Sequence, residues 1–172
     1  RKCVKLRVMH ALDQADFVTR LDPKDMLGLF TRFPEQCAEA VALAQAANLP
    51  SLKTAPQNIV VAGMGGSAAG GDFVKALFDA EGGVPVVVSR DYSAPRWVSS
   101  STLFFATSYS GNTEETIAAY GQAKAAGAMI VVVTGGGKLA EMAKADGYPL
   151  IQIPGGQQPR TALGYLLLPA VV

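Results

Sequence analysis

The stretch Ile59-Val60-Val61-Ala62-Gly63-Met64-Gly65-Gly66-Ser67-Ala68-Ala69-Gly70-Gly71-Asp72 passes from an apolar, β-branched run through a glycine-rich turn into a helical pattern. β-Branched residues favour strands, and glycine allows a tight turn into a helix. At the start of a helix, unpaired backbone N–H groups and the helix dipole favour an anion. The stretch therefore predicts a strand, a turn suited to phosphate, and a helix.

Five short apolar runs alternate with helical patterns over most of the chain. The runs cover residues 59–62, 84–88, 102–107, 129–133 and 148–153. The helical patterns cover residues of about 67–80, 113–127 and 137–146 and continue from about 159 onward. Strands without polar alternation are buried on both faces, as in a parallel sheet covered by helices. We therefore expect an α/β fold with a doubly wound, flavodoxin-like sheet of five parallel strands.

Three Gly/Ser-rich turns follow strands of this predicted sheet. We call residues 63–72 the first turn, residues 108–116 (SYSGNTEET) the second turn, and residues 154–160 (PGGQQPR) the third turn. The carboxyl ends of parallel strands meet at one edge, where such sheets bind ligands. All three turns are therefore expected at that edge, around a phosphorylated small molecule.

The chain divides into three predicted parts. Residues 1–21 form a polar leader. Met9 opens a natural sequence, so residues 1–8 are either native or added upstream of it. Residues 22–56 form a helical segment, and residues 57–172 form the α/β domain.

The helical segment is predicted to run from residue 23 to residue 48. Asp22 is its expected N-cap, ahead of Pro23, and a break is expected near Pro34. In its second half one face carries small apolar residues at helical spacing, which should pack on the α/β domain. These residues are Cys37, Ala40, Val41, Ala44 and Ala47.

The composition indicates a globular protein of a reducing compartment. Of the 172 residues, 49% are hydrophobic and 17% are charged, which suits a sizeable core. The net charge of +1 depends on basic residues within 1–8, so no basic stripe for nucleic acid remains. The two cysteines, Cys3 and Cys37, are too few for a disulfide framework, and we expect a cytoplasmic protein.

Residues 163–172 form an apolar segment that is too short for a membrane span and is broken by Gly164 and Pro169. We interpret it as part of a helix that continues in a longer chain. Left alone, it is expected to form an exposed apolar patch and to favour a homodimer.

The first turn allows three interpretations. It suits a phosphate, with Gly66 and Ser67 at the helix start. It also contains Gly63-x-Gly65-x-x-Ala68 with Asp91 farther along, which is typical of a dinucleotide site. Its glycines are also compatible with close helix packing alone. The dinucleotide interpretation leaves the second and third turns unexplained.

The second turn contains two overlapping patterns. Asn112 and Glu115 fit a capping box, with Asn112 as N-cap. A capping box does not need the hydroxyls of Ser108 and Ser110 ahead of the cap. Together with Thr113, these hydroxyls favour a phosphate site.

The third turn ends on Arg160, at the opening of a predicted helix. A cation there opposes the helix dipole, so a bound anion or a carboxylate partner would offset the cost. His10, the single histidine, lies in the polar leader, remote from the turns. No cluster of metal-ligand spacing is present, and we expect neither a metal nor a cofactor.

These motifs make the chain similar to the sugar isomerase (SIS) domain family, above all to the N-terminal half of bifunctional phosphoglucose/phosphomannose isomerases. The matching strings are GMGGSAAGGD at 63–72, where the family usually has Ile in place of Ala69, SYSGNTEET at 108–116 and PGGQQPRTALGY at 154–165. Asp25-Met26 and Phe33-Pro34-Glu35-Gln36 also match, so the resemblance covers residues of about 22–172.

The resemblance implies a site for a hexose 6-phosphate. Gly66 and Ser67 would lie near the sugar, Arg160 would face the reacting carbons as the catalytic cation, and a trio of hydroxyls would hold the phosphate. That trio is Ser108, Ser110 and Thr113.

The implied reaction interconverts glucose 6-phosphate or mannose 6-phosphate with fructose 6-phosphate through a cis-enediolate. The family's base, ring-opening histidine and a lysine belong to a second SIS domain, expected beyond the domain at 57–172. This chain alone is therefore expected to be inactive. The alternative is a non-catalytic phosphosugar-sensing SIS module, although no basic helix-turn-helix precedes the domain.

Overall fold

The computed structural model describes residues 10–47, 49–50, 52 and 54–172. The expectations for residues 1–8 and for Cys3 concern residues outside this described part.

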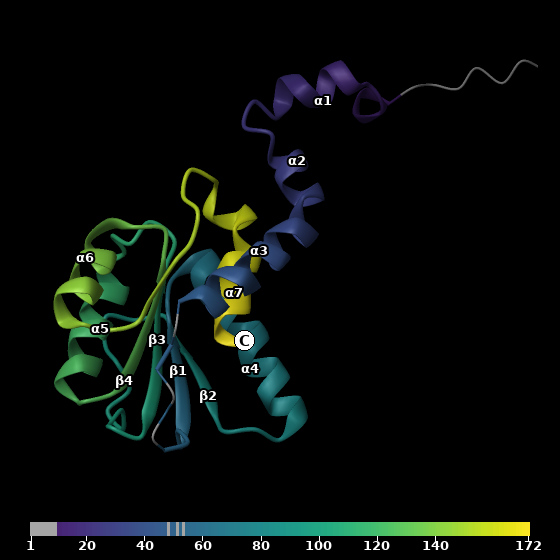
Figure 1. Cartoon of the computed structure of the whole chain (residues 1–172). Coiled ribbons are helices and arrows are strands. Elements are labelled where there is room, and N and C mark those ends of the chain that lie inside the picture. Colours follow the sequence, from purple (N-terminus) through teal and green to yellow (C-terminus); the bar gives the residue numbers. More distant parts are fainter. Residues whose placement is uncertain (1–9, 48, 51, 53) are drawn as a thin grey trace, which may run out of the picture.

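A five-stranded, all-parallel sheet forms the centre of the α/β domain, with the strand order β2-β1-β3-β4-β5 (Figure 1). The strands are β1 (Asn58–Ala62), β2 (Val86–Ser89), β3 (Thr102–Ser108), β4 (Met129–Thr134) and β5 (Leu150–Gln152). The five predicted apolar runs are thus confirmed as strands. Their order is the predicted flavodoxin-like order.

Helices cover both faces of this sheet. The helices between and after the strands are α4 (Gly65–Glu81), α5 (Glu114–Ala125), α6 (Gly137–Asp146) and α7 (Leu163–Leu167). Figure 1 shows α5 and α6 on one face and α4 and α7 on the other. Each face has its own buried cluster, because successive strand residues point to opposite sides: Val60 and Phe104 pack toward α5 and α6, Val61 and Phe105 toward α4 and α7.

The amino-terminal part is helical in several short pieces, two of which lie in the predicted leader and two in the predicted helical segment. They are η1 (Ala11–Asp13), α1 (Ala15–Leu21), α2 (Met26–Thr31) and α3 (Phe33–Ala46). The break lies at Arg32, and Pro34 occupies the first turn of α3, where a missing N–H costs little. The expected start of a helix at Pro23 is wrong, because α2 begins at Met26 with Asp25 at its N-cap position; the Asp22 carboxylate still accepts the N–H groups of Met26 and Leu27, both at 2.8 Å. The predicted apolar face packs inward through Ala40 and Ala44.

The expectation that residues 163–172 form an exposed apolar patch is wrong for most of the segment. Helix α7 packs against α3 and α4, and Tyr165 and Leu166 are buried. The 3₁₀ turn η3 (Leu168–Ala170) also packs on α3. The exposed large apolar residues of the segment are Val171 and Val172. The chain after β5 thus folds back onto the domain, where the apolar side chains of α7 are buried against α3 and α4.

Two glycines of α4 serve packing alone. A Cβ atom on Gly70 would lie 2.8 Å from the carbonyl oxygen of Leu166 in α7. A Cβ atom on Gly71 would lie 2.9 Å from Cγ1 of Val61 in β1. The packing interpretation of the first turn therefore holds for these two positions, and a ligand is not needed to explain them.

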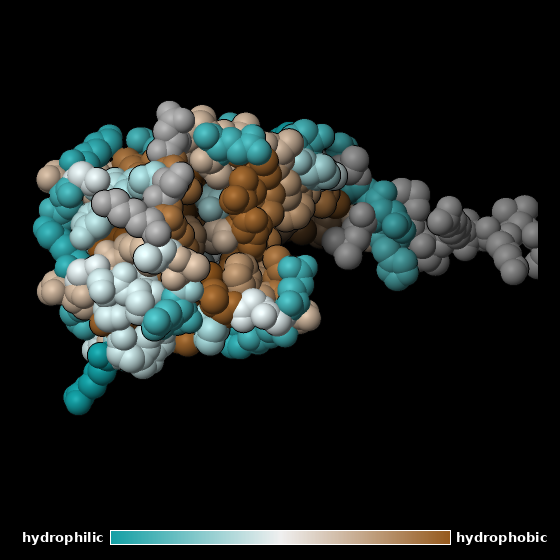
Figure 2. Space-filling view, turned by 60° about the horizontal axis from the view of Figure 1, so that its bottom comes forward, coloured by the Kyte–Doolittle hydropathy of each residue, from teal (hydrophilic) through white to brown (hydrophobic). Residues whose placement is uncertain are grey.

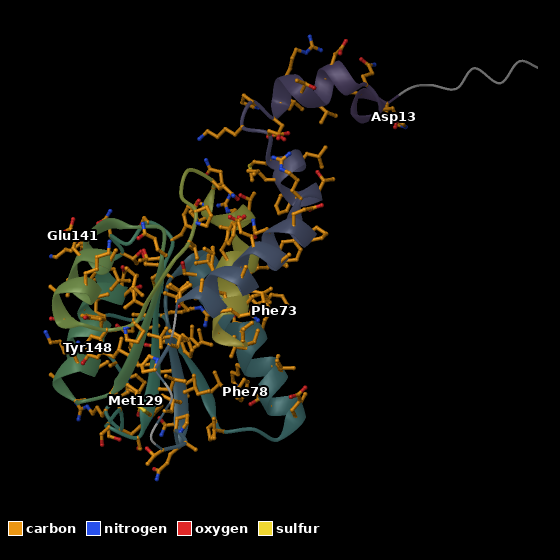
Figure 3. The ribbon with its side chains drawn as sticks, viewed as in Figure 1. Asp13, Phe73, Phe78, Met129, Glu141 and Tyr148 are labelled. Atoms are coloured by element: carbon orange, nitrogen blue, oxygen red, sulfur yellow. The ribbon has the colours of Figure 1, made fainter. Side chains whose placement is uncertain are left out.

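An apolar pocket of about 400 Å³ lies away from the three turns. Leu103, Met129 and Tyr148 line it, near the amino ends of β3 and β4, and Figure 3 labels the latter two. Figure 2, turned so that this end of the sheet comes forward, shows a patch of hydrophobic side chains near the centre of the view, on the side of α4. Within the described residues, no helix is both long and apolar enough to cross a membrane.

Candidate functional site

The first, second and third turns touch one another at the carboxyl edge of the sheet. The backbone N–H of Tyr109 in the second turn donates to Ser67 Oγ of the first, at 3.3 Å. The hydroxyl of Tyr109 accepts the N–H of Gln157 in the third, at 2.8 Å. A Cβ atom on Gly66 would lie 3.0 Å from the carbonyl oxygen of Pro159. The three motifs therefore form one continuous surface.

The second turn brings its three hydroxyls together. Ser108 Oγ lies 2.8 Å from Thr113 Oγ1 and accepts the N–H of Gly111 at 3.1 Å. Ser110 Oγ accepts the N–H of Asn112 at 3.2 Å. Ser108 is buried, Thr113 is half-buried and Ser110 is exposed. The hydroxyls thus extend from the floor of the turn to its rim, and the turn's own N–H groups hold those of Ser108 and Ser110.

Several backbone donors of the same turn remain unpaired. In the described part of the chain, no acceptor lies on the N–H groups of Ser110, Thr113, Glu114 and Glu115. Thr113 is the N-cap of α5, and its side chain makes no capping hydrogen bond. Free N–H groups at a helix N-terminus attract an anion, and adjacent hydroxyls add donors. The turn has the donors that a phosphate needs.

The predicted capping box of Asn112 and Glu115 is wrong. Helix α5 begins one residue later than the box requires, and Asn112 faces a different helix. Its Oδ1 accepts the N–H of Lys138 at 3.0 Å, and its Nδ2 donates to the carbonyl oxygen of Ser110 at 3.2 Å. The side chain therefore caps α6, which lies far away in the sequence, because adjacent parallel strands bring the two turns together.

A fourth turn at residues 134–138 (TGGGK) follows β4 and is not among the three predicted turns. The same signal, glycines directly after an apolar run, could have identified it. Gly111 and Gly137 have positive φ angles, and a Cβ on Gly111 would lie 1.7 Å from the carbonyl oxygen of Gly136. The N–H of Leu139 donates to the carbonyl oxygen of Gly111 at 2.9 Å. The fourth turn thus supports the second turn. The second turn in return accepts the N–H groups of Lys138 and Leu139 at the start of α6, so these donors are not free for an anion.

The first turn supplies further donors beside the hydroxyls. Helix α4 begins at Gly65, whose φ of +52° favours glycine, and Ser67 in its first turn is only 5% exposed. No acceptor in the described residues lies on the N–H groups of Gly65 and Gly66. Asp91, the acidic residue of the dinucleotide interpretation, accepts the N–H of its neighbour Tyr92 at 2.6 Å.

Arg160 is an exposed cation at this edge. It lies within the 3₁₀ turn η2 (Pro159–Thr161), next to the start of α4. Among the described residues it has no ion-pair or side-chain hydrogen-bond partner, in contrast to Arg90, which pairs with Asp72. The alternative of a carboxylate partner for Arg160 is therefore not supported by the described residues, and its guanidinium is available to an anionic ligand.

The start of α5 brings two acidic groups to this edge, Glu114 and Glu115. Glu114 Oε2 lies 3.4 Å from the hydroxyl of Tyr92, and the negative charge of Glu115 is the main cause that raises the pKa of Tyr92. His10 is exposed at the start of η1, and Figure 3 shows the neighbouring Asp13 far from the sheet. The part of the chain that the structure describes thus places no histidine at the edge.

The described residues contain no group of three or more His, Cys, Asp or Glu side chains that could hold a metal ion. Cys37 is a free, half-buried thiol in α3, and burial raises its pKa. A raised pKa disfavours the reactive thiolate.

Comparison with known families and relatives agrees with this geometry. The model of the SIS domain matches residues 51–149. A bifunctional phosphoglucose/phosphomannose isomerase of Caldicellulosiruptor bescii is 45% identical over 139 residues, which are 81% of this chain and 41% of that protein. The protein of the same name from Thermoplasma acidophilum is 47% identical over 114 residues, 66% of this chain and 34% of the relative.

A D-glucosamine-6-phosphate 4-epimerase of Sulfolobus acidocaldarius is also similar, with 37% identity over 142 residues, 82% of this chain and 43% of the relative. The chain thus spans less than half the length of these relatives. Among solved structures, the tagatose-6-phosphate ketose/aldose isomerase of Escherichia coli has the same fold, with a TM-score of 0.64, 19% identity and coverage of 83% of this chain and 45% of that chain.

Proposed function

Because the chain belongs to the SIS domain family, we propose that it binds a hexose 6-phosphate and serves the isomerisation of glucose 6-phosphate or mannose 6-phosphate to fructose 6-phosphate. The observation that supports this best is the second turn, whose clustered hydroxyls and free N–H groups lie at the same edge of the sheet as Arg160, with the Tyr109 hydroxyl bonded to the third turn. The names of the relatives supply the substrate class.

In this proposal each predicted residue has a separate role. Ser108, Ser110 and Thr113 hold the phosphate, because hydroxyls and helix N–H groups together offer several donors to its oxygens. Gly66 lets the third turn lie against the start of α4, since a Cβ there would lie 3.0 Å from the carbonyl oxygen of Pro159, and in this proposal Gly66 and Ser67 contact the sugar.

Arg160 acts on the reacting carbons. The isomerisation moves a proton between C1 and C2, and negative charge develops on the oxygens of the cis-enediolate. A guanidinium placed beside those oxygens stabilises that charge more than it stabilises the neutral sugar. The base and the ring-opening acid come, in this proposal, from a second SIS domain, in line with the greater length of the relatives.

Binding is tested by isothermal titration of the 172-residue chain with fructose 6-phosphate. The double variant Ser110→Ala/Thr113→Ala loses two hydrogen bonds to a charged ligand, each worth about 1.5–3 kcal/mol, so its affinity should fall by a factor of about 100 or more. The matched control is Ser99→Ala/Ser101→Ala, a hydroxyl pair 3.0 Å apart just before β3. Unchanged affinity of the first variant contradicts the site. Binding of NAD in place of sugar phosphates supports the dinucleotide interpretation instead.

A non-catalytic phosphosugar sensor is the second candidate, favoured by the absence of a histidine at the edge among the described residues. A coupled assay from fructose 6-phosphate to glucose 6-phosphate separates the two. We expect no turnover by this chain alone, and turnover by a protein that joins it to a second SIS domain. Turnover by this chain alone would make Glu114 and Glu115 the first candidates for the base.

The proposal extends to the assembly and the location of the protein. We propose a homodimer in the cytoplasm, based on the family resemblance and on the low cysteine count. Analytical ultracentrifugation over a range of concentrations tests the dimer, and a monomer at every concentration contradicts it.

A further inference from the structure

The third turn, which carries Arg160, has little regular structure of its own. Its internal hydrogen bonds are those of one 3₁₀ turn, in which the N–H and the hydroxyl of Thr161 both donate to the carbonyl oxygen of Gln158, at 2.9 and 2.8 Å. A single 3₁₀ turn has little stability by itself. A turn that carries an exposed arginine therefore needs contacts with other segments to keep the arginine in a fixed position. The contacts come from two sides.

One contact comes from the second turn and one from α3. Tyr109 holds the amino-terminal side through the N–H of Gln157, as described above. Gln36 of α3 holds the carboxyl-terminal side: its Nε2 donates to the carbonyl oxygen of Thr161 at 2.7 Å, and its Oε1 accepts the N–H of Gly164 at 2.8 Å. Arg160 therefore lies between two fixed points.

The Gln36 contact is built into the packing. The side chain is 6% exposed, and a Cβ atom on Gly164 would lie 2.9 Å from Gln36 Oε1. Nε2 also lies 3.4 Å from Oε1 of Gln157, so a single buried amide bonds to both sides of the turn. A buried amide whose donors and acceptor are all used holds one geometry, because any displacement leaves a polar group unpaired.

We propose that Gln36 is a positioning residue that holds Arg160 beside Gly66, so that helix α3, outside the sheet domain, is part of the site. The proposal rests on the proposed function, because Arg160 matters only if the edge binds an anionic sugar. It assigns the helical segment before the sheet a role beyond covering the core.

The test compares two ligands of the 172-residue chain by isothermal titration. Fructose 6-phosphate probes mainly the phosphate contacts. 5-Phosphoarabinonate carries the same phosphate and a carboxylate at the position of the enediolate, and thus also probes Arg160. We expect Gln36→Met to weaken binding of the aldonate by about tenfold relative to the sugar, as Arg160→Gln does. The double variant should show no further loss, because both changes remove the same interaction.

Two further variants keep the result independent of stability. Gln36→Glu keeps an acceptor for Gly164 N–H but places a buried carboxylate oxygen against the carbonyl oxygen of Thr161, so an effect at least as large as that of Gln36→Met is expected. Tyr165→Phe removes a neighbouring α3–α7 hydrogen bond, from the Tyr165 hydroxyl to Glu39 at 2.5 Å, without touching the third turn. It should lower stability and leave the ratio of the two affinities unchanged.

Amide hydrogen exchange without ligand gives an independent readout. Exchange of the Gly164 N–H should rise by about tenfold or more in Gln36→Met relative to that of Leu166 in the same helix, whose N–H donates to Ala162. An unchanged affinity ratio, or unchanged relative exchange, overturns the positioning role. Failure of the parent chain to bind either ligand overturns the proposed function, and the positioning role with it.

Discussion

Gly111 joins the second turn to the fourth. Its φ is +69°, and its missing Cβ would lie 1.7 Å from a backbone oxygen of Gly136, which cannot move away without breaking the fourth turn. Positive φ alone costs a non-glycine residue about 1–2 kcal/mol. Steric overlap with backbone adds to this cost.

We therefore expect Gly111→Ala to lower the free energy of unfolding by about 3 kcal/mol or more, measured by urea denaturation. The matched control is Gly127→Ala, because Gly127 has a similar φ of +75° with no atom within 4 Å of the added Cβ. It should cost about 1 kcal/mol. Equal losses in the two variants would show that the contact with the fourth turn is unimportant.

Arg160 should affect turnover more than affinity, because its charge is used mainly in the transition state. In an active isomerase that contains this chain, we expect Arg160→Ala to lower kcat by a factor of about 100 with little change in KM. Lys should restore activity only in part, since it lacks the planar guanidinium. Lys144→Ala, an exposed position in the last turn of α6, is the control. A rise in KM at constant kcat would place Arg160 in ground-state binding.

At the scale of elements, the second turn and α6 depend on each other. Asn112 caps α6 from outside, through the N–H of Lys138. We expect Asn112→Ala to cost about 1 kcal/mol of stability and to accelerate exchange of the Lys138 amide. Asn112→Asp keeps the acceptor and should retain most of the protection. If both variants exchange like the parent, the cap contributes nothing.

Helices α5 and α6 are also joined at their carboxyl ends by Asp146. Its carboxylate accepts the Lys124 ammonium at 2.5 Å and the Tyr120 hydroxyl at 2.6 Å, and these two bonds lower the pKa of Asp146. A lowered pKa stabilises the fold at pH values above the ordinary carboxyl pKa, and this contribution disappears as the pH falls through the folded-state value.

We therefore expect the parent to lose stability on acidification below a pH of about 4, and Asp146→Asn to lose less over the same range. The readout is the free energy of unfolding against pH. Asp91→Asn, an exposed aspartate without a cation partner among the described residues, should respond like the parent. An identical acid response of Asp146→Asn would exclude this linkage.

At the scale of the whole molecule, one tyrosine on each face of the sheet joins core to surface. Tyr120 bonds to Asp146 on the α5–α6 face, and Tyr165 bonds to Glu39 on the α3–α7 face. Burial, followed by the hydrogen bond to the carboxylate, raises the pKa of both phenols above their ordinary value. The folded state therefore keeps these protons when the unfolded chain has lost them.

This difference predicts loss of stability as the pH rises above about 10, where the unfolded phenols ionise. Tyr120→Phe and Tyr165→Phe should each flatten the alkaline decline of the free energy of unfolding. The double variant should show additive effects, because the two sites lie on opposite faces of the sheet. A decline as steep in the double variant as in the parent contradicts the prediction.

Much of the fold could be predicted because its signals are local. Each strand is a continuous apolar run, and each helix around the sheet follows a break of glycine or polar residues, so the five strands and the helix at Gly137–Asp146 lie where the pattern indicated. Parallel pairing then places every strand-to-helix turn at one edge, which is why the hydroxyls of Ser108 and Thr113 and the position of Arg160 could be predicted together.

The tertiary structure alone decided how these groups are held. Asn112 has a local capping pattern with Glu115, yet its side chain caps α6. The reason is that the neighbouring strand β4 brings Lys138 beside Asn112, which a local pattern does not show. Gln36 reads as one polar residue in a helix, and its role depends on Thr161, distant in the sequence. Local sequence patterns thus specify which donors the chain brings to the edge. Packing between distant segments decided which donors are used internally and which remain free for a ligand, since buried hydrogen bonds form with whatever partner the fold brings near.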